Sequence, residues 1–104
     1  MSWKKVDLHG SVSISRLCGE YDIREYVRLP GPGYRVKVFE RGEGFVAYSN
    51  VAFRMEDGTV DGISGAGASE LEALQDVING IAGLMATRPS WTDADLDWMD
   101  PRDF

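Results

Sequence analysis

Alternating aspartates near the end of the chain have the spacing best suited to metal chemistry. Asp93, Asp95 and Asp97 stand two residues apart, as the first carboxylate ligands of an EF-hand calcium loop do. The rest of that loop is missing, because Trp98 occupies the position that needs glycine and Phe104 the position that needs a bidentate glutamate. We therefore predict no bound metal and no other cofactor.

Imidazole, thiol and hydroxyl groups gather in the first twenty residues, where a nucleophile and its base would be sought. The chain has one histidine, His9, and one cysteine, Cys18, with Ser11, Ser13 and Ser15 between them. Nucleophilic catalysis needs a base beside the nucleophile and a third group that orients the base, and no motif here supplies that set. We predict a protein that is not an enzyme, with His9 at the surface and Cys18 as a small buried hydrophobe.

A glycine-rich stretch, residues 62–69, runs directly into a helical pattern over residues 70–85. Free amides before a helix favour anions, so this junction invites a phosphate-binding interpretation. The stretch lacks the lysine of a P-loop and the third glycine of a dinucleotide fingerprint, and Glu70 and Glu72 place negative charge where an anion would bind. We interpret it as a structural loop.

The helix that follows has a well-specified start and one apolar face. Ser69 is the expected N-cap and Glu72 completes a capping box. Gly80 and Gly83 lower helix propensity, and we expect them to allow close approach to the sheet or to another helix. Pro89 ends the segment. The predicted apolar stripe consists of Leu71, Leu74, Val77, Ile78, Ile81, Leu84 and Met85.

Three sequential strands precede the helix. Residues 34–40 and 45–55 alternate between apolar and polar positions, and a third strand begins at Val60 after the turn signal Asp57-Gly58. A four-residue loop over residues 41–44 would place Glu40 opposite Phe45, Val38 opposite Ala47 and Val36 opposite Ser49. A two-residue type I′ turn at Asp57-Gly58 would place Met55 opposite Val60 and Phe53 opposite Gly62.

The first thirty residues carry weaker signals. Val6, Leu8, Val12 and Ile14 share a parity and suggest one more strand or a hairpin, and residues 16–28 are predicted as helix. The fold class is therefore α+β, an antiparallel meander of three to five strands with one long amphipathic helix on one face and a short C-terminal helix or tail. We expect one α+β domain over residues 1–89 and an acidic, aromatic segment over residues 90–104.

This order of elements resembles the second half of double-stranded-RNA-binding domains over residues 34–86, on the basis of three strands followed by Gly65-Ala-Gly67-Ala-Ser69 and a helix that contains Ala73. In that family a Lys-Lys-x-Ala-Lys signature at the helix start grips phosphates. The matching positions here include Glu70 and Leu71, so the resemblance extends to the scaffold and not to the phosphate contacts.

The same region also resembles HicB-type antitoxins, which have three strands followed by a helix of the Gly-x-(Ser/Thr)-x-x-Glu-Ala-Leu type. The corresponding residues here are Gly67-Ala-Ser69-Glu-Leu-Glu72-Ala-Leu74. This resemblance implies a partner that the protein neutralises or regulates, such as a toxin. Similarity of fold alone does not establish that function.

The charge is distributed unevenly along the 104 residues, which carry a net charge of −6. Residues 1–41 hold eight basic and five acidic residues, for +3, whereas residues 42–104 hold three arginines and twelve acids, for −9. Such polarity suggests an oriented or self-associating molecule, or two halves that pair within the fold. No secretory signal or membrane-spanning run is present, and the single cysteine suits a reducing compartment, so we expect a cytoplasmic protein with no membrane partner.

Two surfaces are candidates for binding. The first is the acidic, aromatic segment, which would either dock a basic protein partner or fold back on the domain behind a cap at Thr92. Its candidate residues are Trp91, Asp93, Asp95, Asp97, Trp98, Asp100 and Phe104. The second is a basic and aromatic sheet face for nucleic acid. Its candidate residues are Arg35, Lys37, Phe39, Tyr48 and Arg54.

We expect residues 1–30 to cover the sheet face that carries this second set, because a monomer rarely leaves such a patch open. The function that follows is a small acidic binding module without catalytic activity, acting through protein contacts as an inhibitor, an antitoxin-like protein or a phage accessory protein. Nucleic-acid binding through the sheet face is the alternative. A homo-oligomer is also compatible with the charge layout.

Overall fold

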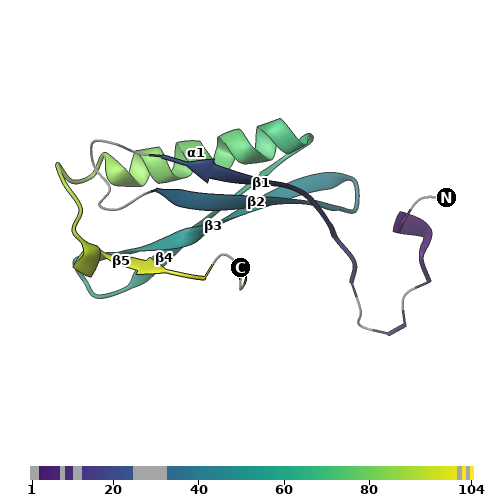
Figure 1. Ribbon diagram of the computed structural model, residues 1–104, viewed down its shortest axis with the longest axis horizontal. Coiled ribbons are helices and arrows are strands. Elements are labelled where there is room, and N and C mark those ends of the chain that lie inside the picture. Colours follow the sequence, from purple (N-terminus) through teal and green to yellow (C-terminus); the bar gives the residue numbers. More distant parts are fainter. Residues whose placement is uncertain (1–2, 8, 11–12, 25–32, 101, 103) are drawn as a thin grey trace.

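A sheet of five antiparallel strands carries one long helix on one of its faces (Figure 1). The computed structural model describes residues 3–7, 9–10, 13–24, 33–100, 102 and 104. The predicted α+β class is therefore confirmed. The elements in chain order are η1 (Trp3–Lys5), β1 (Arg16–Ile23), β2 (Tyr34–Arg41), β3 (Gly44–Arg54), β4 (Val60–Gly67), α1 (Glu70–Met85), η2 (Asp93–Asp95) and β5 (Leu96–Trp98).

The strands form a meander in the order β1-β2-β3-β4, and β5 joins it by pairing with β3. The predicted register of β2 and β3 is confirmed, with Val38 opposite Ala47 and Glu40 opposite Phe45. Beyond Ser49, β3 leaves β2 and pairs with β5 along the same edge. The short last strand, β5, therefore pairs with the part of β3 that lies beyond its pairing with β2.

The hairpin between β3 and β4 differs from the prediction by one residue. Arg54, and not Met55, lies opposite Val60, so the predicted register is wrong at this turn. A type I′ turn needs a positive φ at both central residues, but here only Gly58 has one, at 89°, while Asp57 does not. The connection is a longer loop over residues 55–59, and Gly58 is its residue with a positive φ.

A strand occupies residues 16–23, where the helical prediction for residues 16–28 began. This prediction is wrong because a bulge at Cys18 interrupts the alternation of β1 and conceals its period of two. Beyond the bulge, Tyr21 and Ile23 lie opposite core residues of β2 and pack against the core. Residues 25–28 of that prediction lie outside the described residues.

The strand suggested by Val6, Leu8, Val12 and Ile14 is also not found. Val6 and Ile14 lie outside any strand, and Leu8 and Val12 are outside the described residues. Val6 is 51% exposed, since no neighbouring strand offers it hydrogen bonds or an apolar face.

The glycine-rich stretch is mostly strand and not loop, because β4 continues to Gly67 and leaves only two residues before α1. Two of its glycines let the helix lie directly on the strand. A Cβ at Gly65 would come within 2.6 Å of the Val77 amide nitrogen, and one at Gly67 within 2.7 Å of the Ala73 nitrogen. The stretch therefore acts as a contact surface for α1.

The predicted N-cap of α1 is in place. Ser69 has extended backbone angles, and its hydroxyl accepts a hydrogen bond from the Glu72 amide at 3.2 Å. The Glu72 carboxylate accepts from the amide of Ala68, at 2.8 Å, and not from that of Ser69. The reciprocal bond of the capping box is thus shifted by one residue towards the sheet.

The core lies between α1 and the sheet. Because the glycines of β4 draw the helix close, the small Ala73 lies at the contact, whereas Leu71, predicted on the apolar stripe, is 71% exposed. No helix in the described part of the chain has the length and apolar character needed to cross a bilayer. The buried hydrophobic residues are Tyr34, Val36, Val38, Ala47, Val51, Phe53, Ala73, Val77, Ile81, Met85, Trp91 and Leu96.

The two helix glycines differ in their surroundings. A Cβ at Gly80 would lie 2.9 Å from Cγ2 of Ile63, whereas a Cβ at Gly83 would meet no described atom within 4 Å. Close approach therefore explains Gly80 and not Gly83.

We predict that Gly83→Ala raises the free energy of unfolding by about 0.5–1 kcal/mol, because alanine loses less backbone entropy in a helix. Urea denaturation followed by far-UV circular dichroism measures the change. Gly80→Ala is the contrast, since its methyl group must displace Ile63 and the gain should shrink or reverse. A Gly83→Ala protein less stable than the parent would contradict the open surroundings seen at this residue.

Candidate protein-binding groove on the outer sheet face

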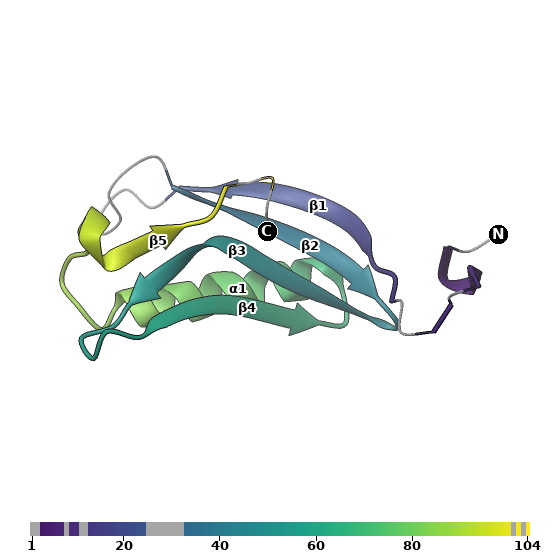
Figure 2. The same ribbon diagram turned by 90° about the horizontal axis from the view of Figure 1, so that it is seen from below.

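The sheet face opposite α1, here called the outer face, carries an apolar row across three strands. Figure 2 looks onto this face, with α1 behind the sheet. Leu17 of β1 lies opposite Phe39 of β2, which in turn lies opposite Val46 of β3. Leu17 is 49% exposed, and Phe39 and Val46 are half-buried. This apolar row on the outer face is therefore only partly covered.

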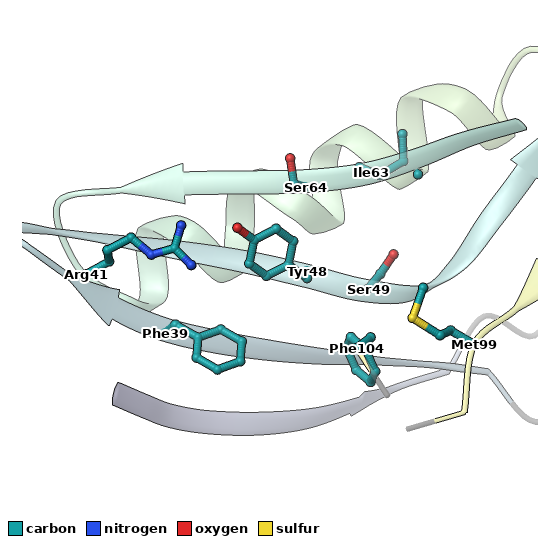
Figure 3. A pocket seen from close by; sticks show the side chains of 9 residues that line it. Phe39, Arg41, Tyr48, Ser49, Ile63, Ser64, Met99 and Phe104 are labelled. Atoms are coloured by element: carbon teal, nitrogen blue, oxygen red, sulfur yellow. The ribbon is translucent and has the colours of Figure 1, made fainter. Parts of the chain in front are cut away.

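A groove lies beside this row. Its volume is about 550 Å³, and its apolar walls come from the rings of Phe39, Tyr48 and Phe104 together with Met99 (Figure 3). Phe39 and Tyr48 meet edge to face, with ring centroids 6.1 Å apart. Arg41 also lines the groove, and no ion pair joins it to any residue in the described part of the chain. The groove thus combines an aromatic wall with one cation.

The groove is open towards β4 because that strand presents small side chains on the outer face. Ser64 lies opposite Tyr48, and Ala66 lies opposite Val46. Farther along β4, Gly62 has no side chain at all and lies opposite Ala52. One side of the groove is therefore lined by the small residues of β4, and the other side by large aromatic side chains.

Asn50 holds the last part of the chain in place along the groove. Its side chain is 8% exposed, and its Oδ1 accepts from the Arg35 amide at 2.8 Å while its Nδ2 donates to the Met99 carbonyl at 3.2 Å. The Met99 amide donates to the Asn50 carbonyl at 2.7 Å. Sequence reasoning missed this residue, although a lone asparagine inside an apolar strand is a signal for a buried polar joint.

Each cation of the predicted nucleic-acid face meets a partner. Ion pairs of this exposed kind weaken the attraction of the face for phosphates, because the positive charge is already balanced. The contacts are Arg35 with Glu20 at 3.4 Å, Arg54 with Asp97 at 2.9 Å, and Lys37 with the main-chain oxygen of Phe104 at 3.2 Å, the Phe104 ring centroid lying 4.5 Å from the ammonium nitrogen.

The two predicted surfaces therefore meet. Phe104 of the acidic segment lies over Lys37 of the sheet face, and both Phe39 and Tyr48 line the same groove as Phe104. Sequence reasoning treated the two sets as separate because Lys37 and Phe104 stand 67 positions apart in the chain. Only the return of the chain through β5 brings them together.

Within the acidic segment, Trp91 and Asp95 are held by contacts inside the domain. Trp91 is 4% exposed and belongs to the core, so its ring is not available to a partner. Asp95 accepts hydrogen bonds from the amide and hydroxyl of Thr92, both at 3.0 Å, and pairs with Arg88 at 3.3 Å. The bonds from Thr92, followed by the charge of Arg88, hold the pKa of Asp95 below its ordinary value.

The remaining members of the segment lie at the surface. Asp93 is exposed at the start of η2, and Trp98 is 40% exposed. Asp100 accepts hydrogen bonds from the Arg102 side chain, which lower the pKa of the Asp100 carboxyl. Residues 96–98 are part of the sheet, so the segment is docked against the domain along this stretch.

The first residues of the chain do not cover the outer face as predicted. η1 lies beyond the end of the β2–β3 hairpin (Figure 1), where Lys4 pairs with Glu40 at 2.7 Å. Residues 16–23 extend the sheet sideways as β1 and do not cross its face. This prediction is wrong over the described part of residues 3–24, because β1 forms its hydrogen bonds at the edge of the sheet. Residues 8, 11–12 and 25–30 lie outside the described residues.

Among the residues that the structure describes, no three His, Cys, Asp or Glu side chains lie together as ligands for a metal ion. Comparison of the chain with models of known families, with curated proteins and with solved structures found no significant match.

Proposed function

We propose that the protein is a binding module without catalytic activity that docks a protein partner on its outer sheet face. The observation that carries this proposal is the aromatic groove, because apolar surface in it and beside it stays exposed. Met99, which lines the groove, and Leu17, which lies opposite Phe39, are each 49% exposed. Exposed apolar patches rimmed by polar residues are typical of protein interaction sites.

A protein partner is favoured over nucleic acid by the charges of the outer face. Its three predicted phosphate contacts are already engaged by Glu20, Asp97 and Phe104, and the whole chain carries a net charge of −6. Binding to nucleic acid requires cations that displace counterions from phosphates. An inhibitor, an antitoxin-like regulator and a phage accessory protein are all roles in which such a groove would hold a partner.

Affinity capture with the full chain as bait tests this proposal. We expect Met99→Glu to lower the recovery of the specific partner at least tenfold, because a charge in the groove must be desolvated on binding. Leu71→Glu is the matched control, since Leu71 is 71% exposed on α1, away from the groove, and recovery should be unchanged. Equal recovery with both variants would refute the groove as the interface.

The nucleic-acid alternative is measured separately, by fluorescence anisotropy with labelled single-stranded RNA at low salt. We expect no saturable binding by the parent protein. Binding that is lost in the double variant Arg35→Ala, Lys37→Ala and weakens as salt is added would replace our proposal with the nucleic-acid function.

A further inference from the structure

The outer edge of β4 offers main-chain groups that the described chain leaves unpaired. The amides of Ala66 and Ala68 point away from β3, towards carboxylates of α1, so the alternation of the strand directs the amides of Val60, Gly62 and Ser64 away from the sheet as well. Within the described residues, no hydrogen bond from outside the strand ladders reaches the amides of these three. They form a short open edge, Val60 to Ser64.

Beyond Ser64 the same edge is closed by α1. The amide of Ala66 donates to the Asp76 carboxylate at 2.9 Å, and the amide of Ala68 donates to the Glu72 carboxylate at 2.8 Å. These two bonds satisfy the next outward amides along the strand. An added strand can therefore pair only with the first part of β4.

The open part of β4 has few of the features that normally protect an edge strand. It contains no proline and no lysine, its one charged residue is Asp61, and the register shift beside it places the extra residues in β3, between Tyr48 and Ala52. The opposite edge, β1, has both a bulge at Cys18 and the exposed charges of Arg16, Glu20 and Asp22. The two edges of the sheet therefore differ, and β4 is the one suited to pairing.

We propose that this edge binds an extended segment of a protein partner as an additional strand over Val60 to Ser64. In the bound segment, apolar or aromatic side chains alternate with lysine or arginine. The inference rests on the proposed function and specifies the chemistry of its partner. Strand addition of this kind obtains affinity from main-chain hydrogen bonds and specificity from pockets for alternate side chains.

The apolar half of that pattern follows from the outer face. Because Gly62 and Ser64 rise so little above the sheet, side chains of an added strand can reach across them to Tyr48 and Met99. A second hollow of about 320 Å³ continues the groove towards Val60. Both hollows lie beside the open edge, on the same side of the sheet.

The basic half follows from the face that carries α1. Asp61 lies opposite Phe53, which is in the core, so it is on the helix side of the edge, where Glu72 and Asp76 also lie. α1 contains no lysine or arginine to balance them. Charge favours a basic partner segment over a second copy of this chain, since each copy carries a net charge of −6.

Synthetic peptides of eight residues test the proposal with the full chain. One peptide alternates valine and phenylalanine with lysine, and a second carries glutamate in place of lysine. We expect the lysine peptide to bind at least tenfold more tightly, and to protect the amides of Val60, Gly62 and Ser64 from exchange in NMR spectra. Equal binding of the two peptides, or protection of β1 amides, would overturn the inference.

Two changes remove the hydrogen bonds without altering charge. Gly62→Pro deletes one outward amide, whereas Gly62→Ala keeps it, so the proline variant should bind at least tenfold more weakly than the alanine variant. N-methylation of the peptide amides that face the edge should have the same effect, which keeps the test valid if the proline variant does not fold. Binding that survives N-methylation in both peptide registers would overturn strand addition.

The outcome for the edge is separable from that for the groove. If the captured partner is lost with Met99→Glu but retained with Gly62→Pro, and N-methylated peptides displace it as well as unmethylated ones do, the groove binds its partner without an added strand. That result would overturn this inference alone and leave the proposed function standing.

Discussion

Replacing Trp91 with alanine should lower the free energy of unfolding by about 3–5 kcal/mol, a large share of the stability of a small domain. The ring is buried, meets Phe53 edge to face with centroids 5.1 Å apart, and donates from Nε1 to the Met85 carbonyl at 3.1 Å. The Arg88 guanidinium lies 4.2 Å from the ring centroid. The variant would leave a cavity and remove one of the two hydrogen bonds of the Met85 carbonyl, which also accepts from the Arg88 amide at 3.4 Å.

Far-UV circular dichroism during urea denaturation measures this loss without depending on tryptophan fluorescence. Trp98→Ala is the matched control, because Trp98 is 40% exposed in the same segment and should cost much less. Equal losses for the two variants would contradict the docking of residues 90–98. Removal of residues 90–104 should likewise destabilise the domain, since Leu96 is also in the core.

Gly65→Ala should lower the free energy of unfolding by about 1–3 kcal/mol, although it adds a single methyl group. The new Cβ would lie 2.6 Å from the Val77 nitrogen and 2.7 Å from the Ala73 oxygen. Both are main-chain atoms of α1, so no side-chain rotation relieves the clash, and the helix must move away from β4. Urea denaturation again measures the effect.

Gly62→Ala on the same strand provides the control. A Cβ there meets no described atom within 4 Å, and Gly62 has no positive φ, so stability should be unchanged or rise by up to about 1 kcal/mol. If Gly65→Ala were as stable as Gly62→Ala, the close contact between β4 and α1 would be refuted. The comparison separates close packing from the general entropic effect of losing a glycine.

The glycine-rich stretch was interpreted as a structural loop, whereas most of it is a strand. Gly65 and Gly67 let α1 lie close against β4. Glycine weakens strand propensity, so the local pattern favoured a loop. Pairing with β3 on one side and contact with α1 on the face override that preference.

The candidate site was predictable only in part. The outward parity of Phe39 and Tyr48 follows from the alternation of their strands, and both residues line the groove. Met99 as a groove residue and Asn50 as the residue that binds its main chain were not foreseen, because both roles depend on β5 pairing with β3 after the chain has passed through α1. A short strand of three residues leaves almost no periodic signal of its own.

The sequence alone determined the elements whose information is local. The register of β2 and β3 follows from the turn between them and their alternating side chains, and the start of α1 follows from Ser69, whose hydroxyl needs only the amide three residues ahead.

Tertiary structure decided the rest. A bulge at Cys18 hid β1 from any fixed period, and contacts between distant residues placed Trp91 in the core and Phe104 over Lys37. Those contacts form because they bury apolar side chains and pair main-chain groups of the sheet. Which segment makes them depends on the packing of the whole chain and cannot be inferred from its local sequence pattern.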